Sequence, residues 1–234
     1  MNSNEWERIQ QVYQGYSDAN LGGTRWSASN AGNRLIGAER QALAGQLLNK
    51  YGFAPLGERR VLDIGCGNGD VLASFCQWGA QPKHLYGLEL LPQRAAAAHS
   101  RYPDLHIMQG NAAMLGFDTG VFDLILFFTV FSSVLNDDLR QTIATEALRI
   151  LKPGGAIIWY DLRIPNPGNA NVKPLGRKEL QSLFPSLTLD LQATTLLPPL
   201  ARRLGKATEL LYPRLSRLGW LRTHYVGLLT AAGR

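Results

Sequence analysis

The sequence predicts an α/β fold in which helices cover both faces of a mostly parallel, doubly wound sheet. From residue 60 to residue 186, short apolar runs typical of strands alternate with longer runs that have helical spacing. Such alternation with short connections is typical of repeated strand–helix–strand units. The length of 234 residues fits one domain with an appended subdomain. A hydrophobic content of 45% excludes a wholly disordered chain.

The N-terminal residues are expected to form two helices joined by a polar, glycine-bearing loop. Apolar residues recur at helical spacing in residues 5–16, and residues 37–51 are rich in Ala, Leu and Gln. Residues 21–34 form the loop between these two helices. We therefore divide the chain into N-terminal helices, residues 1–54, and a main domain, residues 55–234.

Strand-like and helix-like runs follow one another through the main domain. Strands are expected near residues 60–64, 84–88, 105–109, 121–130, 155–162, 187–197 and 222–231. Helices are expected near residues 70–78, 92–101, 137–151 and 176–184. Pro153 ends the third of these helices, because proline cannot continue a helix. A basic helical segment from Leu200 to Leu218, interrupted at Pro213, separates the last two strands. We call residues 198–218 the basic cap.

Positive charge is concentrated in the last third of the chain. The net charge is +6. Residues 1–162 contain 13 Lys/Arg and 15 Asp/Glu, whereas residues 163–234 contain 11 Lys/Arg and 3 Asp/Glu. A solvated basic helix surface or a dimer contact would account for this excess. Attraction to an anionic substrate, a membrane surface or a nucleic acid would also account for it. The sequence does not choose among these alternatives.

Cysteine usage and apolar runs favour a cytoplasmic protein. Cys66 and Cys76 cannot form a disulfide framework or a four-cysteine zinc site. The N-terminus lacks the pattern of a signal peptide, and the longest largely apolar run, residues 124–135, is too short to span a bilayer. No compact Asp/His cluster predicts a metal site.

The sharpest motif is a turn with glycine at three alternate positions, Gly65, Gly67 and Gly69, after the first strand. Glycines there let the backbone pass close beneath a ligand, since no Cβ stands in the way. The dinucleotide-binding fingerprint differs, because its third glycine comes one residue later. Asp70 would also repel a pyrophosphate. Asp63, shortly before the first glycine, suits a cationic ligand that carries an amino acid group.

A second acid follows the next strand. Glu89 stands 20 residues after Gly69, at the end of the strand expected near residues 84–88. A carboxylate at that place can accept two hydrogen bonds from ribose hydroxyls. The glycine turn and its two acids together predict a nucleoside site.

These motifs resemble those of the class I S-adenosylmethionine-dependent methyltransferases. The resemblance covers about residues 55–165, through residues 61–69, 87–89, 122–126 and 151–155. It implies a seven-stranded, Rossmann-like sheet whose antiparallel last strand is inserted between the fifth and the sixth. It also implies S-adenosylmethionine as cofactor, S-adenosylhomocysteine as its product, and no metal.

The resemblance also indicates which residues hold the cofactor. Gly65, Cys66 and Gly67 would approach the methionine part, and Glu89 the ribose. Asn111 stands where the family usually has an acid that accepts from the adenine amino group, and an amide oxygen can also accept that bond. The residues expected to contact the cofactor are Asp63, Gly65, Cys66, Gly67, Gly69, Glu89, Leu90, Asn111, Ala112, Phe128 and Arg34.

The loop before residue 37 resembles that of a subset of bacterial members, through Trp26, Asn30, Asn33 and Arg34. The implied role of residues 1–54 is a lid over the cofactor, in which Arg34 is a partner for the methionine carboxylate. A helix-capping loop would explain the same residues.

The acceptor is expected at the ends of the fourth and fifth strands. Residues 127–131 lack the Asn/Asp-Pro-Pro-aromatic sequence common in methyltransferases of exocyclic or amide nitrogens, which argues against base or glutamine methylation. Phe128 can flank the sulfonium, because ring faces attract cations. The candidate bases are His224 and Asp161. The residues expected to contact the acceptor are Tyr16, Trp26, Thr129, Tyr160 and Arg163.

The sequence thus predicts a methyltransferase that acts on a small molecule, preferably on a hydroxyl oxygen of a specialised metabolite or saccharide-like compound. The basic cap leaves open an anionic or lipid-linked acceptor and peripheral membrane contact. The alternatives are N- or C-methylation of a small molecule or peptide, RNA methylation, and a cofactor-binding scaffold without catalysis. Aromatic residues are not interleaved with basic ones, which argues against nucleic acid. Both a monomer and a homodimer are compatible with the sequence.

Overall fold

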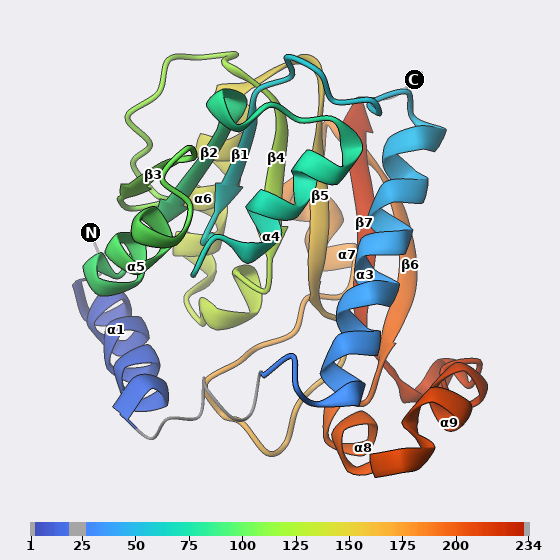
Figure 1. Ribbon diagram of the computed structural model, residues 1–234. Coiled ribbons are helices and arrows are strands. Elements are labelled where there is room, and N and C mark those ends of the chain that lie inside the picture. The colour runs from blue at the N-terminus through green and yellow to red at the C-terminus, as the bar shows by residue number, and fades with distance from the viewer. Residues whose placement is uncertain (1–2, 19–26, 232–234) are drawn as a thin grey trace.

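A seven-stranded mixed sheet forms the centre of the molecule (Figure 1). The structure, a computed structural model, describes residues 3–18 and 27–231. The strands follow the order β3-β2-β1-β4-β5-β7-β6. Only β7 runs antiparallel to its neighbours β5 and β6, as the family resemblance implies. The strands are β1 (Val61–Ile64), β2 (Leu85–Glu89), β3 (His106–Gln109), β4 (Phe122–Phe128), β5 (Leu151–Leu162), β6 (Leu187–Leu196) and β7 (Arg222–Ala231).

Helices cover both faces of this sheet (Figure 1). The helices are α1 (Ser3–Asp18), α3 (Ala31–Lys50), α4 (Asp70–Ser74), α5 (Pro92–Arg101), α6 (Asp137–Ile150), α7 (Arg177–Leu183), α8 (Pro198–Arg203) and α9 (Thr208–Leu215). Helices α3 and α4 pack on one face, and α6 and α7 pack on the other. Helices α8 and α9 belong to the basic cap and pack on α3. Among the described residues, no helix combines the length and the apolar character needed to cross a membrane.

Side-chain alternation along the strands builds a core on each face. In β4, Leu124 and Leu126 join the core under α3, whereas Ile125 and Phe127 join the core under α6. Successive side chains of a strand point to opposite faces, which explains this division. The same alternation in β1 places Asp63 on the face that α3 covers.

Helix α3 begins at Ala31 rather than near residue 37, where the apolar pattern begins. The Asn30 side chain caps the helix by accepting hydrogen bonds from the backbone N–H groups of Gly32 and Asn33. Gly32 is required at this place, because a Cβ there would collide with the carbonyl oxygen of Ala201 in α8. The first turn of α3 therefore packs directly on the backbone of the basic cap.

Two other boundaries differ from the sequence prediction. Strand β5 begins at Leu151, directly after α6, so Pro153 lies within the strand and not in a connection. The basic cap is interrupted at Gly205, with φ of +55°, whereas Pro213 lies inside α9. A proline near the end of a short helix removes one backbone hydrogen bond. A left-handed glycine turns the chain out of the helix altogether.

Candidate active site

A cavity of about 920 Å³ lies where the carboxyl ends of the parallel strands meet. Gly65, Glu89, Thr129 and Tyr160, at or just after the ends of β1, β2, β4 and β5, line it. Helix α1, the first half of α3, residues 164–172 and the start of α8 complete the wall. Open α/β sheets bind ligands at this edge. The volume is at the upper end of the range usual for small-molecule sites.

The glycine turn brings bare backbone to this cavity. Gly65, Gly67 and Gly69 all have positive φ, between +60° and +81°. The N–H groups of Gly65 and Cys66 donate to the carbonyl of Leu88, at 2.7 and 3.0 Å, which ties the turn to the end of β2. A Cβ on Gly65 would lie 2.8 Å from Val130. Of the three glycines, only Gly65 lines the cavity itself.

The Cys66 thiol does not face the cavity. Cys66 is buried, and a Cβ added to Gly87 would lie 2.8 Å from its sulfur. Burial, and then the charges of Asp63 and Glu89, raise the pKa of this thiol well above its usual range. Cys66 therefore packs as an apolar side chain against β2, and only its backbone can approach a ligand.

Glu89 is held in one orientation at the cavity wall. It is buried, and its two carboxylate oxygens accept from the N–H groups of Gly67 and Leu91, at 2.9 and 3.0 Å. Each carboxylate oxygen has a further lone pair, so Glu89 keeps the capacity to accept from two ligand hydroxyls. Leu90 and Ala112, two other residues predicted to contact the cofactor, line the same part of the cavity.

Asn111 lies beside this wall but is not part of it. Its side-chain oxygen accepts from the N–H of Ala113 at 2.8 Å, as in an Asx turn. That oxygen retains a second lone pair. The predicted bond to an adenine amino group therefore stays a prediction.

Asp63 and the half-buried Arg40 each have a buried polar atom without a hydrogen-bond partner among the described residues. Asp63 is 1% exposed, and its Oδ1 has no hydrogen-bond partner among the described residues. Burial above all, and the charge of Glu89, raise its pKa to about 8, against the opposing effect of Arg40. The Arg40 guanidinium lines the cavity over the rings of Phe128 and Tyr160, at 5.3 and 5.2 Å. Its Nε–H is buried and unpaired among the described residues.

Arg40 lines the cavity, whereas Arg34, which the sequence analysis assigned to the methionine carboxylate, does not. Arg34 instead donates to the carbonyls of Ala28 and Ser29, at 3.2 and 3.0 Å, outside the cavity. The signal for Arg40 is its spacing from Ile36 and Ala44, which puts one arginine on the apolar face of α3. Trp26 lies outside the described residues.

His224 presents one nitrogen to the other half of the cavity. Its ring stacks on Tyr160, with centroids 4.9 Å apart, and its Nδ1 lies 2.8 Å from the Thr223 hydroxyl. That hydroxyl donates its only hydrogen to the carbonyl of Thr195. With that bond kept, the Thr223 oxygen accepts from His224, and the tautomer that fits has its hydrogen on Nδ1 and leaves Nε2 as an acceptor.

The cavity wall also contains two backbone conformations that are uncommon for threonine. Thr129 and Thr195 have φ of +59° and +66°, and both line the cavity. They are the non-glycine residues with positive φ within the described ranges. Strained residues of this kind cluster at functional sites.

Asp161 and Arg163, predicted as a base and an acceptor ligand, do not line the cavity. Asp161 is fully buried and accepts from the N–H groups of Ser132 and Leu162, at 3.0 and 2.8 Å. Arg163 donates to the carbonyls of Arg222 and Gly219, at 2.9 and 3.0 Å. Both residues hold backbone in place, because their polar atoms already have backbone partners.

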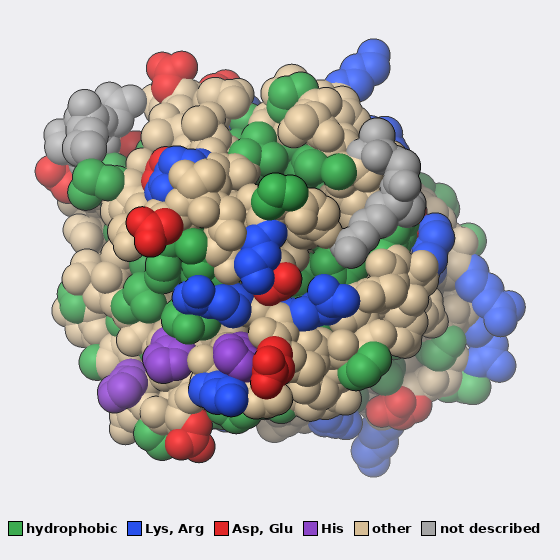
Figure 2. Space-filling model, turned by 90° about the horizontal axis from the view of Figure 1, so that it is seen from above, with side chains coloured by type: hydrophobic (Ala, Val, Ile, Leu, Met, Phe, Trp, Pro, Cys, Tyr) green, Lys and Arg blue, Asp and Glu red, His purple; other side chains and the backbone are tan. Residues whose placement is uncertain are grey.

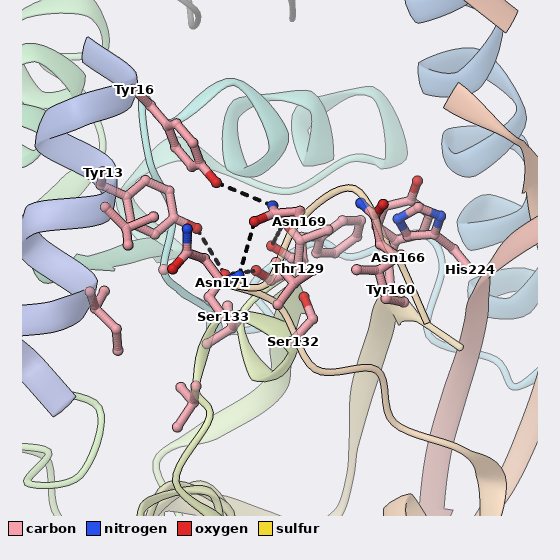
Figure 3. A pocket seen from close by; sticks show the side chains of 18 of the residues that line it. Tyr13, Tyr16, Thr129, Ser132, Ser133, Tyr160, Asn166, Asn169, Asn171 and His224 are labelled. Carbon is pink, nitrogen blue, oxygen red and sulfur yellow. Dashed lines mark hydrogen bonds between the residues drawn. The ribbon is translucent and has the colours of Figure 1, made fainter. Parts of the chain in front are cut away.

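Helix α1 and residues 164–172 form a polar wall opposite the sheet, and Figure 3 shows their side chains turned toward one another. The Tyr13 hydroxyl lies 3.0 Å from that of Ser133. The Tyr16 hydroxyl accepts from the Asn169 amide at 3.2 Å. Tyr16 and Asn166 both line the cavity, and the predicted contact of Tyr16 with the acceptor stays a prediction. Within the described ranges, no group of three or more His, Cys, Asp or Glu side chains could hold a metal ion.

Known proteins share both the sequence motifs and this architecture. Residues 62–159 match the protein family described as methyltransferase domain. Through these residues the chain is similar to the class I S-adenosylmethionine-dependent methyltransferases. A solved structure, an S-adenosylmethionine-dependent methyltransferase from Archaeoglobus fulgidus, matches with a TM-score of 0.61. The match covers 92% of this chain and 99% of that chain at 13% identity, and it shows the common fold alone.

Curated relatives match part of this chain. It is 32% identical over 132 residues to demethylmenaquinone methyltransferase of Chlorobaculum tepidum, covering 56% of this chain and 51% of the relative. It is 27% identical over 142 residues to (+)-O-methylkolavelool synthase of Herpetosiphon aurantiacus, and the match covers 58% of this chain and 46% of that relative. The chain spans about half the length of the curated relatives it matches.

The buried state of His224 predicts how stability depends on pH. Burial above all, and then the charge of Arg40, lower its pKa from 6.5 to about 3. As pH falls below 6.5 the unfolded chain takes up this proton first, so the folded state loses stability between pH 6.5 and 3, by up to about 1.4 kcal/mol per pH unit. Urea unfolding at pH 7, 6 and 5 should show that the free energy of unfolding falls more steeply with decreasing pH in the unmodified protein than in His224→Phe.

The tautomer can be read from the same protein. The ¹⁵N resonances of His224 at pH 7 should show a protonated Nδ1 and a bare Nε2. A protonated Nε2, or equal pH dependence in the two proteins, would contradict the assignment.

Proposed function

We propose that the protein transfers a methyl group from S-adenosylmethionine to a hydroxyl oxygen of a small, largely apolar acceptor. The observation that carries the proposal is that Glu89 and Arg40 line one side of the cavity and His224 lines the other. Asp63 lies buried near the end of β1, before the glycine turn that borders this cavity. Groups for a charged nucleoside and an acceptor for a hydroxyl hydrogen would thereby share one cavity.

The residues on the nucleoside side fit S-adenosylmethionine. Glu89 would accept from the ribose hydroxyls, for which its lone pairs remain available. Arg40 would bind the methionine carboxylate, because its buried Nε–H lacks a partner among the described residues. The unpaired oxygen of Asp63 would face the amino group, whose positive charge would restore the ionised form of the carboxyl. When bound, S-adenosylmethionine supplies a methyl group on a positively charged sulfur, which a nucleophile can displace directly.

The rest of the wall suits an acceptor with an apolar body. Apolar side chains come from α1, from the turn after β4, from the end of β5 and the loop after it, and from the start of the cap: Ile9, Val12, Val130, Leu162, Ile164, Val172, Leu197 and Pro198. Hydroxyls and amides occur at intervals among them, as at Tyr16 and Asn166. The names of two relatives, one for demethylmenaquinone and one for O-methylkolavelool, support acceptors of this apolar kind.

His224 would orient the acceptor hydroxyl by accepting its hydrogen bond at Nε2. The imidazole is neutral at pH 7 because burial holds its pKa near 3. A base this weak suffices, since the oxygen becomes strongly acidic once it has gained the methyl group. Positioning and proton acceptance by His224, together with exclusion of water by α1, are the contributions of the protein.

An acceptor screen tests this proposal. The protein with S-adenosylmethionine is incubated with terpenoid alcohols, quinols and phenols, with matched amines as the comparison and with RNA. Formation of S-adenosylhomocysteine and the mass of each product are measured. We expect O-methylated products, and we expect His224→Phe to lower kcat at least tenfold while S-adenosylmethionine affinity changes little. Products methylated only on nitrogen, carbon or RNA, or tight cofactor binding without turnover, would overturn it.

A further inference from the structure

Large apolar side chains are exposed on the basic cap. Five large hydrophobic residues among those described are exposed, and four of them lie between residues 197 and 220. Trp220 is 74% exposed, Leu210 59% and Leu218 42%. Exposed leucines are common singly, but a concentrated group that includes a tryptophan marks an interaction surface.

The orientation of α9 is fixed by its contacts with α3. Tyr212 is buried, and its hydroxyl donates to the Glu39 carboxylate at 2.7 Å. Residues on the opposite side of α9 must therefore face outward. Leu210 and Arg214 are exposed four residues apart on α9, so they form one exposed stripe, and the exposed Arg217 follows the end of the helix at Leu215. Leu218 and Trp220 come directly after it.

Positive charge surrounds these apolar side chains. Arg203, Lys206, Arg214 and Arg217 are all exposed. The cap contains a single acid, Glu209, which lies 3.9 Å from Arg34. Figure 2 views the molecule from the end where the parallel strands begin, and Lys and Arg side chains project at its right-hand margin. Tryptophan and leucine flanked by Lys and Arg match the interface of an anionic bilayer.

The same cap forms part of the cavity wall. Leu197, Pro198, Pro199 and Arg202 line the cavity, and the exposed stripe lies on the next helix. Helices α8 and α9 stand together at one side of the cavity end of the sheet (Figure 1). A surface that rests on the cap would thus lie beside the cavity.

We propose that the exposed face of the basic cap, formed by Leu210, Arg214, Arg217 and Leu218, docks onto an anionic lipid bilayer together with Trp220, which follows the cap. The apolar side chains enter the interface, and the arginines stay level with the lipid phosphates. Net positive charge favours this partner over a second copy of the same face, which would repel itself. The docking needs neither cofactor nor acceptor, so it can be tested apart from methyl transfer.

Cosedimentation with vesicles tests the docking. The full chain, without cofactor, is mixed with vesicles of phosphatidylcholine alone or with a third of phosphatidylglycerol. We expect binding to the anionic vesicles that weakens as salt is raised. Trp220→Ser/Leu218→Ser and Arg214→Gln/Arg217→Gln should each lower binding at least tenfold. These side chains are exposed, so the variants should keep the melting temperature of the parent protein.

Matched variants separate the cap from general surface effects. Met114→Ser removes an apolar side chain that is 66% exposed outside the cap, and Lys83→Gln/Lys178→Gln removes two exposed charges outside it. Both should bind vesicles as the parent protein does. The proposal is overturned if the protein does not bind anionic vesicles, or if the control variants lose as much vesicle binding as the cap variants. It is also overturned if sedimentation shows a dimer that Trp220→Ser/Leu218→Ser dissociates.

Discussion

Replacing Glu89 with glutamine should lower the affinity for S-adenosylmethionine about 100-fold or more, as measured by titration calorimetry. Both carboxylate oxygens are already oriented by backbone N–H groups, so each can accept from one ribose hydroxyl without reorganisation. Hydrogen bonds to a charged group contribute about 1.5–3 kcal/mol each, and about 1.4 kcal/mol corresponds to a factor of ten. The amide also turns an N–H₂ group toward one of the two backbone N–H groups.

Asp104→Asn is the matched control for this variant, because Asp104 is an exposed acid outside the cavity. It should bind S-adenosylmethionine as the parent protein does. Glu89→Gln must also melt cooperatively, so that lost binding is not lost folding. A folded Glu89→Gln protein with unchanged affinity would remove Glu89 from the cofactor site.

Replacing Arg40 with methionine should lower the affinity for S-adenosylmethionine about 10- to 100-fold. Methionine keeps the apolar stem against Phe128 and Tyr160 and removes the charge. A charge-assisted hydrogen bond between the half-buried guanidinium and a carboxylate accounts for a loss of this size. The nucleoside 5′-methylthioadenosine has no carboxylate, so its affinity should not change.

Arg34→Met is the control, since Arg34 binds backbone carbonyls outside the cavity. It should leave both affinities unchanged. Two results would contradict the role of Arg40. In the first, Arg34→Met lowers the affinity for S-adenosylmethionine and Arg40→Met does not. In the second, Arg40→Met lowers the affinities for S-adenosylmethionine and 5′-methylthioadenosine equally. The second would mean that Arg40 supports the fold of the site and not the carboxylate.

The sheet and the nucleoside side could be predicted from the sequence because both are encoded locally. A strand, a glycine turn and an acid at the end of the next strand lie within residues 61–89, and backbone geometry alone brings them together. Arg40 was not predicted, because its role depends on how α3 packs on the sheet. That packing brings a helical residue beside Asp63, Phe128 and Tyr160.

On the acceptor side of the cavity, position in the sequence does not predict which side chains face a ligand. Tyr160 and Asp161 are neighbours at the end of β5, yet only Tyr160 faces the cavity. Alternation turns Asp161 to the face on which the Ser132 turn lies, where backbone N–H groups occupy its oxygens. The sequence locates the end of the strand, but the packing of the neighbouring elements decides which side chain is available to a ligand.

The contact between Gly32 and Ala201 has a mechanical consequence. Since no side chain separates α3 from α8, the two helices meet as rigid backbones without a compressible layer between them. Arg40 lies eight residues further along the same helix, roughly 12 Å from that contact. Helix α3 thus connects the first turn of the cap to the guanidinium in the cavity. A displacement of α8 is expected to shift α3 and, with it, Arg40.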